Sequence, residues 1–196
     1  MKNKIDIFKK NLASSISIKN LVLADKDLLK KLEDVTNAFI NTFQSKGTVL
    51  FCGNGGSAAD AQHLAAEFSG RFYYDRDPLD SEALHVNTSY LTAVANDYSY
   101  DEVFARMVKA RGKKNDLIIG LSTSGNSKNV LRAFEEAKNQ EMTTVLFTGQ
   151  DGTNQPDIVD YLLKIPSNDT PRIQECHMLL GHTICELVEA ELFPKS

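Results

Sequence analysis

Two glycine- and hydroxyl-rich stretches in the sequence have the composition of anion-binding turns. Residues 53–57 read Gly-Asn-Gly-Gly-Ser, and residues 122–127 read Ser-Thr-Ser-Gly-Asn-Ser. Glycine lets backbone amides approach a ligand closely, and hydroxyl groups donate hydrogen bonds to phosphate oxygens. Neither stretch has the spacing of a nucleotide-binding loop or of the dinucleotide fingerprint. The pattern therefore predicts a small phosphorylated ligand, although serine and threonine are also common as ordinary helix caps.

A histidine and a glutamate lie four residues apart shortly after the first turn, at His63 and Glu67. On a helix this spacing puts both side chains on one face, one turn apart. Such a pair suits a zinc site or a proton-transfer site. An isolated pair of this kind is also typical of a hydrogen-bonded helix surface, and the spacing alone favours that simpler interpretation.

The last part of the chain contains two of its four histidines, His177 and His182, shortly after Gln174. His177 is closer in helical angle to Gln174 than His182 is, so the spacing favours His177 as the partner of Gln174. A single histidine in a helix usually has a structural role. Neither histidine identifies a site without further observations.

These residues are predicted to be positioned by alternating strands and helices. Apolar residues recur at helical spacing over residues 4–24 and 27–43, which predicts two amphipathic helices at the start. Short apolar runs predict buried strands at residues 48–52, 83–86, 117–121, 143–147 and 161–165. Further helices are predicted at residues 57–68, 90–110, 129–139 and 172–193. The alternation predicts a parallel sheet covered by helices on both faces.

Both predicted anion-binding turns follow a buried strand and precede a helix. In an open parallel sheet such turns lie at the carboxyl ends of the strands, where ligands bind. The N-terminus of the helix that follows adds free N–H groups and the positive end of its dipole. The two turns are therefore expected to bind phosphate together.

The composition is that of an average globular domain, with 42% hydrophobic and 24% charged residues among 196, so one domain over residues 1–196 is expected. The net charge of -4 disfavours nucleic acid and membranes as partners. The polar start and the lack of any apolar run near the ~20 residues that span a bilayer favour a cytoplasmic location. Cys52, Cys176 and Cys185 lie in apolar segments and are predicted to be reduced core residues.

Several stretches together resemble the signatures of a known family. Residues 52–63, which read Cys-Gly-Asn-Gly-Gly-Ser-Ala-Ala-Asp-Ala-Gln-His, and Glu67 after them are similar to the first signature of the phosphoheptose isomerases of the sugar isomerase (SIS) family. Residues 96–97 (Asn-Asp), 122–127 and 172–175 (Arg-Ile-Gln-Glu) resemble the other signatures, in the same order. The resemblance covers nearly the whole chain and is far more specific than any one glycine turn.

The resemblance implies a fold and an assembly. The fold is an α/β three-layer sandwich of the flavodoxin-like kind, with a five-stranded parallel sheet preceded by two N-terminal helices. The assembly is a homotetramer with sites between subunits. The helices of residues 1–45 are apolar on one face yet lie outside the alternating core, so they are expected to pack between subunits.

The resemblance also implies roles for individual residues. The zinc-binding positions of the family fall on His63, Glu67, Gln174 and His182. Its acid/base pair falls on Glu67 and His182, whereas His177 falls on a position without a catalytic role. Its substrate-contacting positions fall on Asn54, Gly55, Gly56, Ser57, Asn96, Asp97, Ser122, Thr123, Ser124, Ser127 and Gln174. Some members place an aspartate directly before the arginine, whereas this chain reads Asp-Thr-Pro at residues 169–171, which leaves the role of Asp169 open.

The implied activity is an aldose–ketose isomerisation that converts D-sedoheptulose 7-phosphate into D-glycero-D-manno-heptose 7-phosphate through an enediol. It would be the first step of ADP-heptose synthesis for a lipopolysaccharide core or capsule. Glu67 and His182 would transfer the protons, and one zinc ion per subunit would polarise the carbonyl and hydroxyl oxygens. Glutamine is an unusual zinc ligand, so labile occupancy is expected.

Two other functions fit parts of the sequence. A replication-initiation factor that binds the DnaA initiator shares this fold, the first glycine turn, the 172–175 segment and an end similar to residues 191–194. It lacks counterparts of Glu67 and His182, and their presence here favours an enzyme, since only chemistry requires an acid and a base. The second is a sugar-phosphate sensor, or an SIS isomerase acting on a six-carbon phosphate. It stays open because chain-length selection depends on pocket depth.

Overall fold

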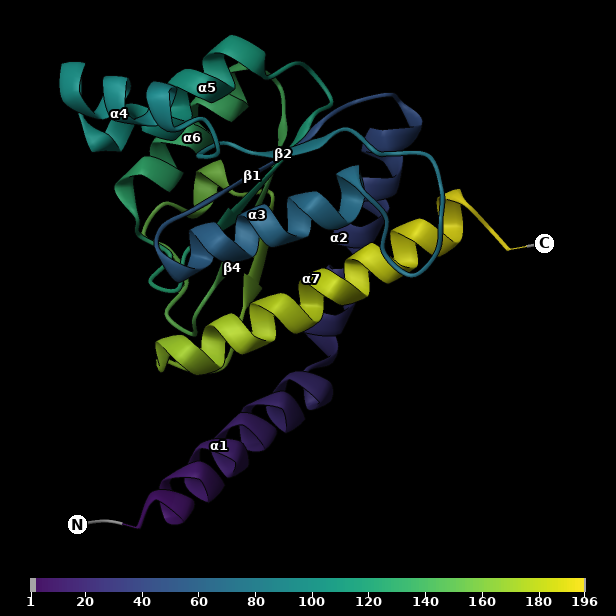
Figure 1. The fold of residues 1–196 in the computed structure, drawn as a ribbon, viewed down its shortest axis with the longest axis vertical. Helices are drawn as coiled ribbons and strands as arrows, with labels where there is room; N and C mark the ends of the chain where they lie inside the picture. The colour runs from purple at the N-terminus through teal and green to yellow at the C-terminus, as the bar shows by residue number, and fades with distance from the viewer. Residues whose placement is uncertain (1–2, 196) are drawn as a thin grey trace.

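A computed structural model of the chain describes residues 3–195, within which a five-stranded, all-parallel sheet lies between two layers of helices (Figure 1). The strands are β1 Val49–Gly53, β2 Ser81–Ala83, β3 Leu117–Leu121, β4 Thr143–Thr148 and β5 Tyr161–Lys164, in the spatial order β2-β1-β3-β4-β5. The helices are α1 Lys4–Ala24, α2 Lys26–Gln44, α3 Gly56–Ser69, α4 Thr88–Asp97, α5 Val103–Arg111, α6 Lys128–Asn139 and α7 Thr170–Leu192. The predicted fold class is therefore confirmed.

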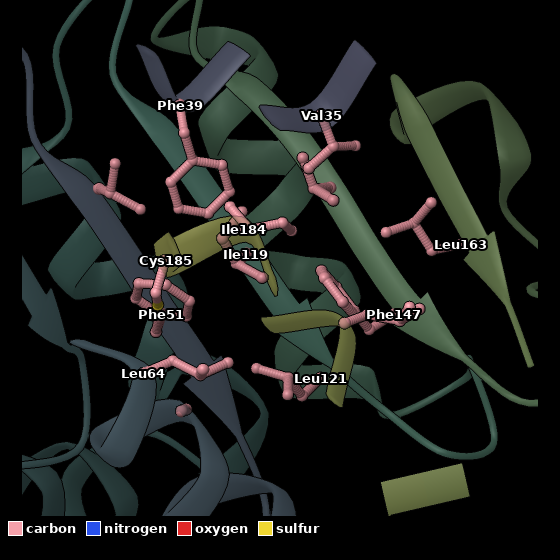
Figure 2. Packing of buried hydrophobic residues seen from close by; sticks show 14 of the residues in the cluster. Val35, Phe39, Phe51, Leu64, Ile119, Leu121, Phe147, Leu163, Ile184 and Cys185 are labelled. Carbon is pink, nitrogen blue, oxygen red and sulfur yellow. The ribbon is translucent and has the colours of Figure 1, made fainter. Parts of the chain in front are cut away.

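Strands β1 and β3 are buried along their whole length and carry no charged or hydroxyl side chain, because helices cover the sheet on both faces. Side chains of a strand alternate between the two faces, so Phe51, Ile119 and Phe147 join a core with α2, α3 and α7. Leu50 and Ile118 join the opposite core with α4, α5 and α6. Figure 2 shows the first core, in which the side chains of the strands meet those of α2 and α7.

Two predicted boundaries were wrong. The strand expected at residues 83–86 is observed at Ser81–Ala83, and its pairing with β1 ends where residues 84–86 turn away. The single helix expected over residues 90–110 is broken into α4, the short 3-10 helix Tyr100–Glu102 and α5. The break lies at residues 98–99, where Ser99 has an extended backbone (φ -167°, ψ 163°) between α4 and the 3-10 helix.

Helix α1 projects from the body of the chain (Figure 1). Its apolar side chains are largely exposed, with Phe8 at 70%, Leu12 at 64% and Leu23 at 72%. Polar contacts attach α1 to the start of α7: the Ser15 hydroxyl donates to Glu175 Oε2 at 2.6 Å, and the Arg172 guanidinium donates to a carbonyl of α1. Within the part of the chain described, no helix is long and apolar enough to cross a membrane.

Cys52, Cys176 and Cys185 are buried free thiols, as predicted. Burial raises the pKa of the Cys52 thiol and of the Cys185 thiol, so both remain protonated near neutral pH.

Candidate active site

Helices α3 and α7 run side by side in the same direction and carry the candidate catalytic residues (Figure 1). Near their starts, the Gln174 amide donates to Ser57 Oγ at 3.4 Å. Further along, a Cβ atom added to Gly181 would lie 2.6 Å from Leu64 Cδ2, so a larger residue there would force the Leu64 side chain to move. The parallel arrangement keeps this pairing constant, since Ser57 and Gln174, like Leu64 and Gly181, are 117 positions apart in the sequence.

His63, Glu67 and His182 form a cluster on this helix pair. His63 Nε2 lies 3.0 Å from Glu67 Oε1, and the centroids of the His63 and His182 rings are 5.0 Å apart. One ligand atom from each of the three residues lies within 4.8 Å of the other two. The structure therefore brings together both predicted acid/base residues and three of the four predicted zinc ligands.

The ring of His182 is partly shielded by Phe72, whose ring centroid lies 5.7 Å away at an interplanar angle of 29°. Burial lowers the pKa of His182 below its ordinary value of 6.5; the nearby His63 lowers this pKa further, while Glu67 opposes the shift. The neutral imidazole is therefore favoured near neutral pH. A neutral ring can accept or relay a proton and can bind a metal ion.

His177 lies in the core and not in this cluster. Gln174 and Gly181 face α3, whereas His177 and His182 lie on opposite flanks of α7, since each residue advances by about 100°. The flank with His177 faces the sheet: its ring is fully buried, packs edge-on against Phe147 at 5.6 Å and has Nε2 3.3 Å from the Thr148 carbonyl oxygen. Burial lowers the pKa of His177 to about 4, which keeps the ring neutral.

Gln174, the fourth predicted zinc ligand, lies beside the first glycine turn. A Cβ atom on Gly56 would be 2.6 Å from Gln174 Nε2, so the missing side chain makes room for this amide. Gln174 and His182 are separated by eight residues, or about 12 Å along the helix axis. The observed position suits a substrate contact, and a role of Gln174 in metal binding stays a prediction.

Three hydroxyl groups converge in the second turn, between β3 and α6. Ser122 Oγ lies 2.9 Å from Ser127 Oγ and 3.5 Å from Ser124 Oγ. Ser127 occupies the N-cap position of α6, yet its hydroxyl bonds to Ser122 and does not cap the helix. Gly125 has a φ of 69°, and a Cβ atom there would lie 1.8 Å from the Gly152 carbonyl oxygen. The conformation of this turn fits an anion site better than an ordinary helix cap.

Side-chain hydrogen bonds join the first turn to the start of α6, which directly follows the second turn. Gly53 of β1 pairs with Leu121 of β3, which places the turns at the same edge of the sheet. Asn54 and Asn129 exchange two amide hydrogen bonds of 2.9 and 2.8 Å, and the Tyr100 hydroxyl donates to Asn54 Oδ1 at 3.1 Å. Neither Asn129 nor Tyr100 was predicted as a site residue, because no spacing relates them to Asn54 in the sequence.

The remaining predicted substrate contacts are placed as follows. Gly55 has a φ of 56° in the first turn, directly before α3. In the second turn, the carbonyl of Thr123 accepts a hydrogen bond from the backbone N–H of Gly149. Asn96 and Asp97 are exposed at the end of α4, where the Asn96 amide donates to Asp97 Oδ1 at 2.9 Å. Asn96 and Asp97 therefore lie on α4, outside both turns.

Comparisons with known proteins agree with this geometry. Residues 16–149 match the family model of the SIS domain. The phosphoheptose isomerase of Aneurinibacillus thermoaerophilus is 47% identical over 96% of this chain and 95% of its own length. The structure of phosphoheptose isomerase GmhA from Neisseria gonorrhoeae is 37% identical, with a TM-score of 0.89 over 96% of this chain and 100% of that one. A phosphoheptose isomerase from Francisella tularensis is 32% identical, with a TM-score of 0.90 over 95% and 98%. The chain therefore belongs to the SIS-domain family and, within it, to the phosphoheptose isomerases.

Proposed function

We propose that this enzyme isomerises D-sedoheptulose 7-phosphate to D-glycero-D-manno-heptose 7-phosphate, the first step of ADP-heptose synthesis for a lipopolysaccharide core or capsule. The observation that carries the proposal is the cluster of His63, Glu67 and His182 on α3 and α7, of which α3 begins at the first glycine-rich turn. A scaffold that binds the DnaA initiator would need no acid/base cluster. The relatives named phosphoheptose isomerase support the substrate class. The free cysteines fit the reducing cytoplasm, which we propose as the location of the reaction.

The proposed mechanism transfers one proton between C1 and C2 through a cis-enediol. The Glu67 carboxylate takes the proton from the carbon beside the carbonyl and returns it to the neighbouring carbon. His182, neutral and close to Glu67, moves the proton between the two oxygens. His63 Nε2 lies 3.0 Å from Glu67 Oε1 and so fixes the orientation of the carboxylate. The phosphate is held by the hydroxyls and backbone amides of the two turns, which orient the reacting carbons.

The direct test of this function is incubation of the purified protein with sedoheptulose 7-phosphate, with fructose 6-phosphate as the comparison substrate. Formation of the heptose 7-phosphate, detected by chromatography and mass spectrometry, would support the proposal. Preferred turnover of the six-carbon phosphate would reassign the substrate. No turnover of either substrate, together with binding to the DnaA initiator, would make the scaffold the better description.

Phosphate binding by the second turn predicts a loss of affinity in Ser124→Ala and in Ser127→Ala. Each variant removes a hydrogen bond to a charged group, worth about 1.5–3 kcal/mol, so the Kd for the substrate should rise about 10- to 100-fold. Calorimetric titration with sedoheptulose 7-phosphate measures the change. Ser45→Ala, at the exposed end of α2, is the matched control. Unchanged affinity in both turn variants would show that this turn does not bind the phosphate.

The His63, Glu67 and His182 side chains also fit a zinc ion, because imidazole nitrogen and carboxylate oxygen are donors that zinc accepts. Their ligand atoms are already clustered within 4.8 Å. When bound, zinc would act as a Lewis acid on the carbonyl and hydroxyl oxygens. Gln174 is the proposed fourth ligand, which requires its side chain to leave Ser57.

Metal binding is expected at one zinc ion per subunit. Elemental analysis after zinc loading and dialysis should find this ratio, and His63→Ala should lower it strongly, since a ligand is removed. His85→Ala is the matched control, because His85 lies outside the cluster. A zinc content near zero in the unmodified protein, with a rate that chelation leaves unchanged, would exclude the metal and leave direct acid/base catalysis.

We also propose that residues 1–196 are a single SIS domain that assembles as a homotetramer, with α1 and α2 packing between subunits. The exposed side chains of α1 support this, because an apolar face of this size is rarely left in water. The variant Phe8→Glu/Leu12→Glu is expected to form smaller species in light scattering coupled to gel filtration. Lys10→Glu, on the other side of α1, should leave the mass unchanged. A tetramer in the double variant would contradict the role of α1.

A further inference from the structure

An almost fully buried ion pair, Arg76 with Glu189, lies next to the candidate active site and has no part in the proposed chemistry. The two side chains are 2% and 1% exposed, and Arg76 Nε lies 3.1 Å from Glu189 Oε1. Burying two charges costs so much solvation energy that such a pair often adds no net stability. The remaining hydrogen bonds of both groups therefore indicate what the pair does.

The Arg76 guanidinium binds the C-terminal end of α3. Its Nη2 donates to the carbonyl oxygen of Glu67 at 2.8 Å, and its Nη1 donates to those of Phe68 and Gly70 at 2.7 and 3.0 Å. Carbonyl groups in the last turn of a helix have no partner within the helix. Arg76 supplies that partner and attaches directly to the backbone of the candidate base, Glu67.

The Glu189 carboxylate binds the segment that follows α3. It accepts hydrogen bonds from the backbone N–H groups of Phe72 and Tyr73 at 2.9 and 2.7 Å. Burial alone would raise the pKa of Glu189, but these two bonds and Arg76 outweigh it and hold the pKa below its usual value. Glu189 lies seven residues after His182, two turns along the same face of α7. The Phe72 ring, on the segment that Glu189 binds, has its centroid 5.7 Å from that of the His182 ring.

We propose that Arg76 and Glu189 are positioning residues for catalysis: through residues 70–77, the strap, they fix Glu67 and His182 relative to each other. One ion pair is bonded to the backbone of the base and, through Phe72, supports the ring of the acid. This inference rests on the proposed function, because it assigns the strap a role in that proton transfer. Neither residue touches the substrate in this proposal.

Kinetics of Arg76→Gln and of the paired variant Arg76→Met/Glu189→Met test the role. Misplaced catalytic groups should lower kcat about 10- to 100-fold, while KM changes little because the phosphate-binding turns are untouched. The paired variant fills the buried space with apolar side chains and leaves no unpaired charge, so it should fold even if Arg76→Gln does not. Arg76→Lys should recover part of the rate. Arg111→Gln, which breaks the half-exposed pair with Glu82, is the matched control.

A double-mutant cycle separates positioning from general stability. In the Glu67→Gln background, Arg76→Gln should cause a smaller loss of kcat than in the unmodified protein, because one of the two groups that it positions has been replaced. A full additional loss in that background, or an unchanged kcat in folded Arg76→Gln and in the paired variant, would overturn the proposal.

A spectroscopic measurement makes the inference independent of activity. The four histidines of the chain give few ring signals in protein labelled with ¹³C-histidine, and the spectra are taken where all rings are neutral. In Arg76→Gln the His182 signal should move as Phe72 leaves its ring, while the core residue His177 should keep its signal. An unchanged His182 signal would overturn the positioning role. An inactive unmodified protein with a moved signal would overturn the proposed function and leave only the structural support of the His182 ring.

Discussion

Glu67→Gln is expected to lower kcat for heptose-phosphate isomerisation about 10²- to 10⁴-fold, the range typical of general acid–base catalysis. The amide keeps the size of the side chain and can still bond to His63, but it cannot accept the proton from carbon. The site therefore stays assembled while its base is lost. Initial rates at saturating sedoheptulose 7-phosphate measure the effect.

The control for Glu67→Gln is Glu186→Gln, an exposed glutamate on α7 one turn after His182. It should retain the rate of the unmodified protein. Substrate affinity in Glu67→Gln should change much less than kcat, because the phosphate-binding turns are not altered. Full activity in a folded Glu67→Gln protein would show that another group takes the proton.

His182→Asn is expected to cause a comparable loss of kcat, since His182 is the proposed relay of the proton between the substrate oxygens. His182 is partly exposed, so the substitution should change thermal stability little. His177→Asn should do the reverse. It removes a fully buried ring packed on Phe147, so the melting temperature should fall by about 2–4 °C for each kcal/mol lost while kcat is retained.

The comparison of the two histidine variants requires both rates and melting curves, with rates measured well below the lower melting temperature. A larger fall of kcat in His177→Asn than in His182→Asn would reverse the assignment of roles. Equal losses of stability in the two variants would show that His182 also has a structural function.

Strands β1 and β3 were predictable because they are buried along their whole length and are therefore apolar. The break between α4 and α5 was missed because the apolar spacing of Tyr90 to Ala110 continues across Ser99, whose extended backbone interrupts the helix. Residue spacing also could not predict which of His177 and His182 lies in the site. Spacing gives the helical angle between two residues, but it does not show which flank of the helix faces the sheet. The family resemblance grouped His182 with His63, and the structure places these two rings 5.0 Å apart.

Contacts between residues far apart in the sequence could not be predicted. Arg76 and Glu189 are separated by 113 positions, and no spacing in the sequence relates them. Only the fold of residues 70–77 against α7 buries their charges. The same holds for Asn54 and Asn129, whose mutual hydrogen bonds depend on the adjacent placement of β1 and β3.

The buried cysteines have a practical consequence for measuring the metal. Cys185 lies three positions after His182, yet its thiol is buried and its pKa is raised, so it should neither compete with the imidazoles for zinc nor react readily with oxygen. Cys52 and Cys176 are equally shielded. The protein should therefore tolerate buffers without dithiothreitol or mercaptoethanol, both of which bind zinc. Zinc titrations can then be made against the protein ligands alone.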